Sequence, residues 1–166
     1  RKKAEFPLIR ADMRYFPFRS HVFNAVINMF TSFGYLPSET EDMKTLSEVN
    51  RVLKENGLFL LDVVNKDYVT KVYKERNWAE FAPFYLLEKR SLDLPKSMLL
   101  SEWTIIKKNT KEVRHIQHDL RLYSFQKLRK MLSEVGLTVK QVYGGYDKKQ
   151  FSPNSSRMIM LAERKV

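Results

Sequence analysis

The sequence predicts an α/β protein, and the prediction rests on three segments in the first part of the chain. Strands at 22–29 and 58–64 are apolar almost throughout, as parallel strands buried on both faces are. Between them lies a helix that begins at Ser38 and ends at Asn56-Gly57. A strand, a helix and a strand with short connections form a parallel crossover unit, which is the building block of α/β folds.

The helix has clear start and stop signals. Ser38 and Glu41 form a capping box, in which each side chain satisfies a backbone donor of the first turn. Apolar residues then recur at spacings of three or four, at Met43, Leu46, Val49 and Leu53. Asn56-Gly57 ends the helix, because glycine accepts the left-handed conformation that helix ends favour.

The remaining segments complete the α/β prediction. Leu8, Ile9 and Ala11 predict a short buried strand, and Asp12 lies where that strand opens into a loop. Beyond the crossover unit we expect a short helix, three extended segments joined by hairpin turns, a helix capped by Ser124 and stopped by Gly136, and two final strands. Their ranges are 66–76; 84–94, 98–108 and 112–123; 124–136; 137–143 and 158–163.

Composition limits the class of protein. A chain of 166 residues with 43% hydrophobic residues suits one globular domain. No apolar run approaches the roughly 18 residues of a membrane span, and Arg1–Glu5 lacks the apolar core of a signal peptide, so we expect a soluble, cytoplasmic protein. The absence of cysteine excludes disulfides, thiolate metal sites and a cysteine nucleophile.

Positive charge is concentrated in the last third of the chain. Residues 107–166 contain 14 basic and 5 acidic side chains, a net charge of +9, whereas residues 1–106 contain 16 and 14. Such a surface could attract nucleic acid or anionic substrates. The same side chains also suit solvated helix faces and hairpin tips, and this is the interpretation that we favour.

Three stretches follow one another in the first part of the chain: A-D-M-R-Y-F-P-F at 11–18, F-N-A-V-I-N-M-F-T-S-F-G-Y at 23–35 and R-V-L-K-E-N-G-L-F-L-L-D at 51–62. In this order they resemble the class I S-adenosylmethionine-dependent methyltransferases, especially the branch of N-methyltransferases that act on amino sugars. The resemblance implies a Rossmann-like methyltransferase sheet with an antiparallel β insertion. It also implies S-adenosylmethionine as methyl donor, S-adenosylhomocysteine as product, no metal, and a small-molecule acceptor.

The resemblance assigns cofactor roles to four residues. Asp12 stands where the family accepts a hydrogen bond from the adenine amino group, and Met13 would border the ring. Met29 and Phe30 end the second strand and would lie near the sulfonium, at the strand edge where α/β proteins bind ligands. Asp12 also suits a simple turn, and Met29 and Phe30 also suit core packing.

The resemblance is incomplete in two respects. Asn24 replaces a residue that is usually acidic in the family, and the glycine-rich cofactor loop and the ribose-binding acidic residue are missing. The glycines include no G-x-G; they stand at 34, 57, 136, 144 and 145. Because that loop supplies much of the cofactor affinity, we predict that the chain is part of a methyltransferase and binds the cofactor weakly alone.

This interpretation divides the chain into parts of one incomplete methyltransferase domain at 1–166. Residues 1–65 form the cofactor-side α/β part, and residues 78–123 form the antiparallel insertion, which serves as an acceptor cap or a dimer surface. Residues 124–166 form the closing helix and β-hairpin. Methylation of RNA and a non-catalytic, methyltransferase-like module are the alternative functions.

Catalytic residues are weakly indicated. Tyr35 could orient an acceptor or cap the core, and His118 could line the cavity under the insertion, with Asp119 beside it, or be purely structural. His115 and His118 have a metal-like spacing, but residues three apart on a strand point to opposite faces, so we predict no metal site. The aromatic residues of the insertion suit an acceptor pocket, a homodimer interface or a core: Trp78, Phe81, Phe84, Tyr85 and Trp103.

Overall fold

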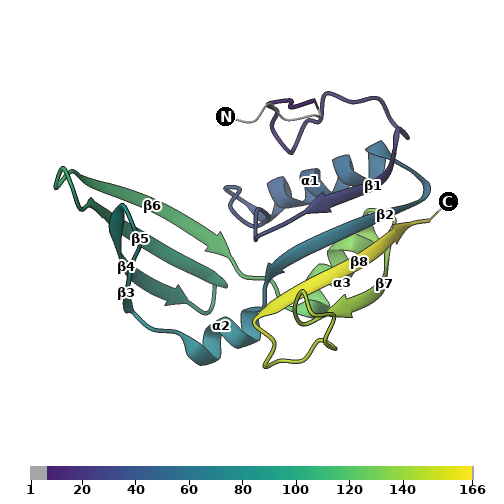
Figure 1. Ribbon diagram of the computed structural model, residues 1–166. Helices are drawn as coiled ribbons and strands as arrows, with labels where there is room; N and C mark the ends of the chain where they lie inside the picture. Colours follow the sequence, from purple (N-terminus) through teal and green to yellow (C-terminus); the bar gives the residue numbers. More distant parts are fainter. Residues whose placement is uncertain (1–6, 166) are drawn as a thin grey trace.

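The computed structural model describes residues 7–165. The strands form two four-stranded sheets, which lie in separate lobes (Figure 1). The first sheet has the strand order β1-β2-β8-β7, and the second has the order β3-β4-β5-β6. Within the described part, no helix is long and apolar enough to cross a membrane. The expectation drawn from Arg1–Glu5 lies outside the described residues.

The first sheet contains the predicted crossover unit. β1 and β2 are parallel, and β8 is antiparallel to both β2 and β7. The strands are β1 (Phe23–Asn28), β2 (Leu53–Val64), β7 (Leu137–Tyr143) and β8 (Arg157–Arg164). The α/β prediction is confirmed.

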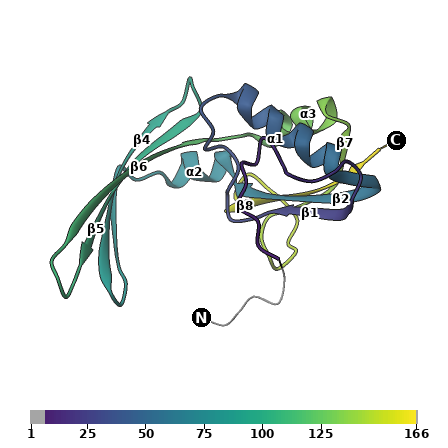
Figure 2. The same ribbon diagram turned by 90° about the horizontal axis from the view of Figure 1, so that it is seen from above.

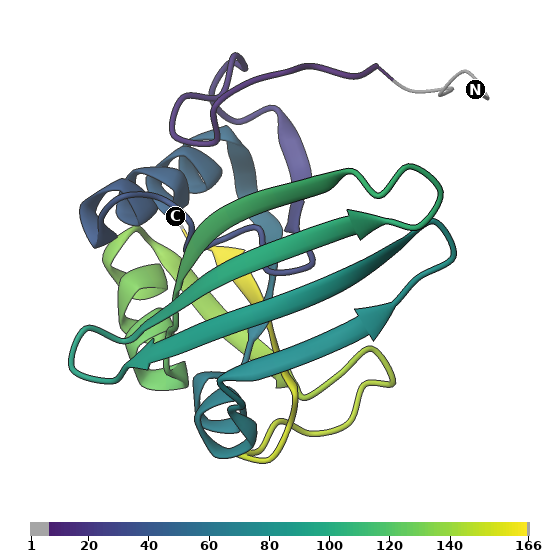
Figure 3. The same cartoon turned by 90° about the vertical axis from the view of Figure 1, so that its left-hand side faces the viewer.

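Two helices, α1 (Glu39–Val52) and α3 (Phe125–Glu134), lie together on one side of this sheet (Figure 3). Leu61 of β2 pairs with Met160 of β8, and both are buried in the core. The same core contains apolar side chains of both helices, including Leu46, Val49, Leu128, Met131 and Leu132. The main hydrophobic core therefore lies between the helices and one face of the sheet.

The opposite face of the sheet is only partly covered. Ile27 of β1 and Leu58 of β2 are 69% and 40% exposed. The expectation that β1 is buried on both faces is therefore wrong for the described residues. The physical reason is that α1 and α3 pack on the same side, so that no helix within residues 7–165 covers this side of β1.

The predicted strand at Leu8–Ala11 does not form. Leu8 and Ile9 are 78% and 57% exposed, and the segment has no strand partner among residues 7–165. A strand satisfies its backbone donors and acceptors through neighbouring strands. An apolar sequence alone is therefore not enough to form one.

Helix α1 begins as predicted, but its capping box is only half formed. The Ser38 hydroxyl accepts a hydrogen bond from the Glu41 backbone N–H, at 3.2 Å. The Glu41 carboxylate instead makes ion pairs of 2.6 Å with Arg14 and with Lys44. Through Arg14, the side chain that was expected to cap the helix therefore anchors the segment that precedes β1.

The helix ends earlier than predicted, at Val52. Leu53 is already extended and begins β2. The residue with positive φ is Asn56, at 58°, rather than Gly57. A Cβ at Gly57 would lie 2.8 Å from the Lys54 carbonyl oxygen, so close backbone approach explains this glycine.

The second sheet is an antiparallel meander that curves away from the first lobe (Figure 2). Its strands are β3 (Arg76–Glu80), β4 (Phe84–Asp93), β5 (Met98–Lys107) and β6 (Val113–Arg121). The three predicted extended segments correspond to β4, β5 and β6. β3 was not predicted. The helix expected at 66–76 is shorter in the structure, where α2 (Lys66–Val72) ends at Val72, and β3 begins at Arg76.

Candidate functional site

The carboxyl ends of β1 and β2 lie at one edge of the first sheet, which is where α/β proteins bind ligands. The loop at 29–37 leaves β1 at this edge and leads into α1. Two fully buried carboxylates hold it, Asp62 from β2 near its start and Asp42 from α1 near its end. The side chains that this loop presents are therefore supported by buried hydrogen bonds.

Asp62 holds the start of the loop in an uncommon conformation. Phe30 and Thr31 have positive φ angles of 58° and 59°, which residues other than glycine rarely adopt. The Phe30 N–H donates to Asp62 Oδ2 at 2.8 Å, and the Thr31 N–H donates to the Asp62 carbonyl at 3.0 Å. Thr31 Oγ1 in turn accepts from the Val64 N–H at 3.1 Å.

The same carboxylate joins two further segments. Arg157 donates to Asp62 Oδ1 from Nε at 2.8 Å and from Nη2 at 2.5 Å. The Tyr146 hydroxyl donates to Asp62 Oδ2 at 2.6 Å, and this hydrogen bond, with a smaller contribution from burial, raises the Tyr146 pKa. The Tyr146 and Phe30 rings are neighbours, with centroids 6.2 Å apart.

Asp42 supports the end of the loop through Arg121 and Tyr123. Asp42 Oδ2 accepts hydrogen bonds of 2.6 Å from both Arg121 Nη1 and the Tyr123 hydroxyl. Arg121 also donates to the carbonyl oxygens of Leu36 and Pro37, at 3.2 and 3.3 Å. Burial raises the pKa of Asp42 despite these two donors, so the carboxylate depends on them to remain charged.

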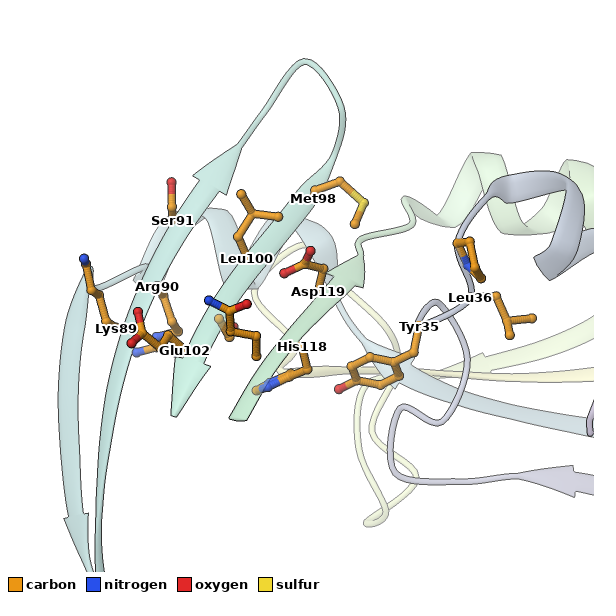
Figure 4. A pocket seen from close by; sticks show the side chains of 13 residues that line it. Tyr35, Leu36, Lys89, Arg90, Ser91, Met98, Leu100, Glu102, His118 and Asp119 are labelled. Atoms are coloured by element: carbon orange, nitrogen blue, oxygen red, sulfur yellow. The ribbon is translucent and has the colours of Figure 1, made fainter. Parts of the chain in front are cut away.

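Tyr35 and His118, the two catalytic candidates, line one pocket of about 730 Å³. Their ring centroids are 6.1 Å apart, and Figure 4 shows Tyr35 reaching from the loop towards His118 on β6. Trp103 packs edge-on against His118, with centroids 4.4 Å apart. The Tyr35 phenol is protonated at neutral pH and can donate a hydrogen bond, and burial raises its pKa further above its ordinary value.

The other two polar candidates of β6 do not support His118. Asp119 points to the opposite side of the strand from His118 in Figure 4, and no hydrogen bond joins the two in the described part of the chain. The His115 Nδ1 lies 3.0 Å from Thr104 Oγ1. His115 and His118 therefore face opposite ways, and no group of metal-ligating side chains occurs within residues 7–165.

The aromatic residues of the insertion do not form one cluster. Paired residues on neighbouring antiparallel strands share a face, and the pairings put Trp78 and Tyr85 on the face opposite to Trp103 and His118. Trp78 and Tyr85 line a second, mainly apolar pocket of about 590 Å³. Trp103 packs against His118, whereas Trp78 and Tyr85 line the second pocket, so these residues do not form one aromatic acceptor pocket.

Asp12 forms a turn, which is the simpler of the two roles that its sequence position allowed. Its Oδ1 accepts the Arg14 backbone N–H at 2.9 Å, and its Oδ2 accepts Arg14 Nη2 at 2.6 Å. These bonds lower the Asp12 pKa to about 2, so the exposed carboxylate is charged at neutral pH. The ion pair of Arg14 with Glu41 places this turn beside the first turn of α1. Met13 is partly buried next to it.

Asp12, Met29 and Phe30 therefore lie on the side of the sheet where β1 ends and α1 begins. Sequence reasoning missed the residues that support this edge: Asp42, Asp62, Arg121, Tyr146 and Arg157. A detectable signal did exist, because Asp62 is an acidic residue inside the apolar run L-F-L-L-D-V-V, and such a residue must find donors when it is buried.

Much of the positive charge of the last third is paired with acidic side chains. Ion pairs join Lys107 to Glu112, Lys108 to Glu80, Lys127 to Glu39, Lys140 to Glu163 and Lys149 to Asp147. Because these pairs lie on different elements, the charge is spread over both lobes. This distribution agrees with the favoured interpretation of solvated faces.

The comparisons with known proteins identify the fold. Residues 1–61 match the methyltransferase domain family. The CcbJ methyltransferase of Streptomyces caelestis is 13% identical, with a TM-score of 0.81, over 94% of this chain and 62% of its own. An S-adenosylmethionine-dependent methyltransferase of Clostridium acetobutylicum is 14% identical, with a TM-score of 0.82, over 94% and 63%.

Two further similarities extend over most of the chain. The sugar N-methyltransferase KedS8 of Streptoalloteichus is 18% identical, with a TM-score of 0.71, over 99% of this chain and 65% of its own. An uncharacterised protein of Methanocaldococcus jannaschii is 24% identical over 87% of this chain. The chain spans 51% of that relative and less than two thirds of the three methyltransferase structures.

Proposed function

We propose that this chain, which has the Rossmann-like fold of the class I S-adenosylmethionine-dependent methyltransferases, belongs to an enzyme that methylates a small molecule. One observation carries the proposal. The stretch that matches the methyltransferase family contains the loop at 29–37, and that loop brings Tyr35 beside His118 in a pocket lined mostly by the insertion. The cofactor side and an acceptor pocket therefore adjoin.

The residues at the sheet edge fit part of S-adenosylmethionine. Asp12 offers a charged carboxylate whose remaining lone pairs can accept from an amino group. Met13 would border the adenine, and Met29 and Phe30 would lie at the sulfonium end. When bound, S-adenosylmethionine supplies an electrophilic methyl group on a positively charged sulfur.

The pocket residues have roles that suit methyl transfer to an amine or a hydroxyl. Tyr35, as a neutral phenol, orients the acceptor by a hydrogen bond, and His118 takes the proton that the acceptor loses. The methyl–sulfur bond breaks as the bond to the acceptor forms, and sulfur keeps the electron pair as S-adenosylhomocysteine. Alignment in a restricted pocket supplies much of the acceleration for such a displacement.

The pocket suits a small polar acceptor. Among the charged residues that line it, Arg90 shares the sheet face of His118, whereas Lys89, Glu102 and Asp119 lie on the opposite face. Arg90 can donate hydrogen bonds to hydroxyl groups. The similarity to the sugar N-methyltransferase KedS8 supports an amino-bearing sugar as the first acceptor to test. The homodimer, the nucleic-acid partner and the cytoplasmic location stay predictions.

Residues 1–166 alone are expected to bind S-adenosylmethionine only weakly, with a Kd on the order of 1 mM, because they contain no G-x-G loop for the methionine part. We propose that a glycine-rich segment outside these residues completes the site. Isothermal titration calorimetry of residues 1–166 and of the full-length protein measures the difference. Micromolar affinity in residues 1–166 would contradict the proposed division of the cofactor site.

A further inference from the structure

Asp62 has no direct part in the proposed chemistry, yet it connects three segments at the cofactor edge. Its carboxylate accepts hydrogen bonds from Phe30, Tyr146 and Arg157, which lie after β1, in the β7–β8 loop and at the start of β8. All these groups are donors. Asp62 is fully buried, so nothing in the surrounding solvent can replace a lost contact.

Two exposed aromatic rings result from this arrangement. Phe30 and Tyr146 are 76% and 56% exposed, although their rings are neighbours at 6.2 Å. The positive φ of Phe30 is an unfavourable conformation for a bulky residue, and it persists only where the surroundings hold it. Asp62 does so through the Phe30 N–H, and it fixes Tyr146 through the hydroxyl.

We propose that Asp62 is a positioning residue that presents the Phe30–Tyr146 ring pair as a recognition surface for the positive charge of the sulfonium. Aromatic faces attract cations, and the attraction disappears for a neutral ligand of the same shape. The inference rests on the proposed function. The new element is that these two rings discriminate between the charged donor and the neutral product S-adenosylhomocysteine.

Four variants of the full-length protein separate the parts of this inference. Phe30→Leu removes one ring, and Tyr146→Phe removes only the hydroxyl that reaches Asp62. Asp62→Asn leaves one acceptor oxygen where four donor contacts converge. Tyr143→Phe is the matched control, because its hydroxyl bonds to Gln141 and not to Asp62.

Calorimetry with S-adenosylmethionine and S-adenosylhomocysteine gives the first result. Phe30→Leu and Asp62→Asn should weaken binding of the charged donor about five- to tenfold, the range of a cation–π contact, and weaken binding of the neutral product much less. Tyr146→Phe should show a smaller change in the same direction, and Tyr143→Phe none. Equal losses for both ligands would overturn the inference while leaving the proposed function intact.

Amide hydrogen exchange at Phe30, measured by NMR, tests the positioning role independently of any ligand. Exchange should be faster in Asp62→Asn than in the unaltered protein, and unchanged in Tyr143→Phe. Unchanged exchange in Asp62→Asn would overturn the role of Asp62 even if the rings recognise charge. If the unaltered full-length protein binds neither ligand, the proposed function fails and the charge recognition fails with it.

Discussion

Replacing Asp42 with alanine should lower the free energy of unfolding by about 3 to 5 kcal/mol, the usual effect of breaking a buried ion pair by removing one partner. The variant leaves the Arg121 guanidinium, 13% exposed in its side chain, and the buried Tyr123 hydroxyl without their shared acceptor. Urea denaturation followed by circular dichroism measures the loss. A change below about 1 kcal/mol would contradict the structural role assigned to Asp42.

Asp147→Ala is the matched control for this prediction. Asp147 also forms an ion pair, with Lys149 at 2.7 Å, but both side chains are exposed. Exposed pairs add little to stability because solvent screens them. The urea midpoint of Asp147→Ala should therefore match that of the unaltered protein.

The pH dependence of an Arg121→Met variant gives a second test of the same network. Burial raises the pKa of Asp42 in the folded protein, so its protonated form is favoured by folding. The stability associated with this proton is fully present below the unfolded pKa and is lost as pH rises through the folded value. Without Arg121, stability should rise as the pH is lowered from 8 to 5. A stability that stays unchanged or falls as the pH is lowered from 8 to 5 would contradict the raised pKa of Asp42 in this network.

Replacing His118 with alanine should reduce turnover about 100-fold or more, as expected when a general base is lost. The proposed proton acceptor lies beside Tyr35 and Trp103 in the acceptor pocket, and it is not one of the residues proposed to hold the cofactor. The affinity for S-adenosylmethionine should therefore stay unchanged. Release of S-adenosylhomocysteine by the full-length protein, with a panel of amino-bearing sugars as acceptors, measures turnover.

His115→Ala is the control for the catalytic prediction. The residue lies on the same strand, but it bonds to Thr104 on the opposite face of the sheet. Its removal should leave turnover unchanged. Equal activity of the His118→Ala and unaltered proteins would assign His118 a structural role against Trp103, as the sequence also allowed.

The fold was largely predictable because its signals are local. Ser38 and Ser124 cap α1 and α3 as their sequences indicate, and their hydroxyls accept hydrogen bonds within the first turn. The failures occur where tertiary contacts decide. Leu8–Ala11 has an apolar pattern but no strand partner within the described residues, and Glu41 pairs with Arg14 rather than completing its cap.

The candidate site was less predictable, because its contacts join residues far apart in the chain. Tyr35 and His118 could be nominated singly, but only the fold places their rings 6.1 Å apart. Asp62 received no role, since its donors come from the loop after β1, from Tyr146 and from Arg157. No periodicity or motif in one sequence reports such pairings.

Calorimetric titration of S-adenosylmethionine into the full-length protein and its Asp12→Ala variant tests the central claim most directly. The unaltered protein should bind, and the variant should bind about tenfold or more weakly, because it lacks the carboxylate that we propose accepts the adenine amino group. Asp67→Ala, at the start of α2, serves as a control and should bind normally. No binding by the unaltered protein, or equal affinities for it and Asp12→Ala, would contradict the cofactor site proposed for this chain.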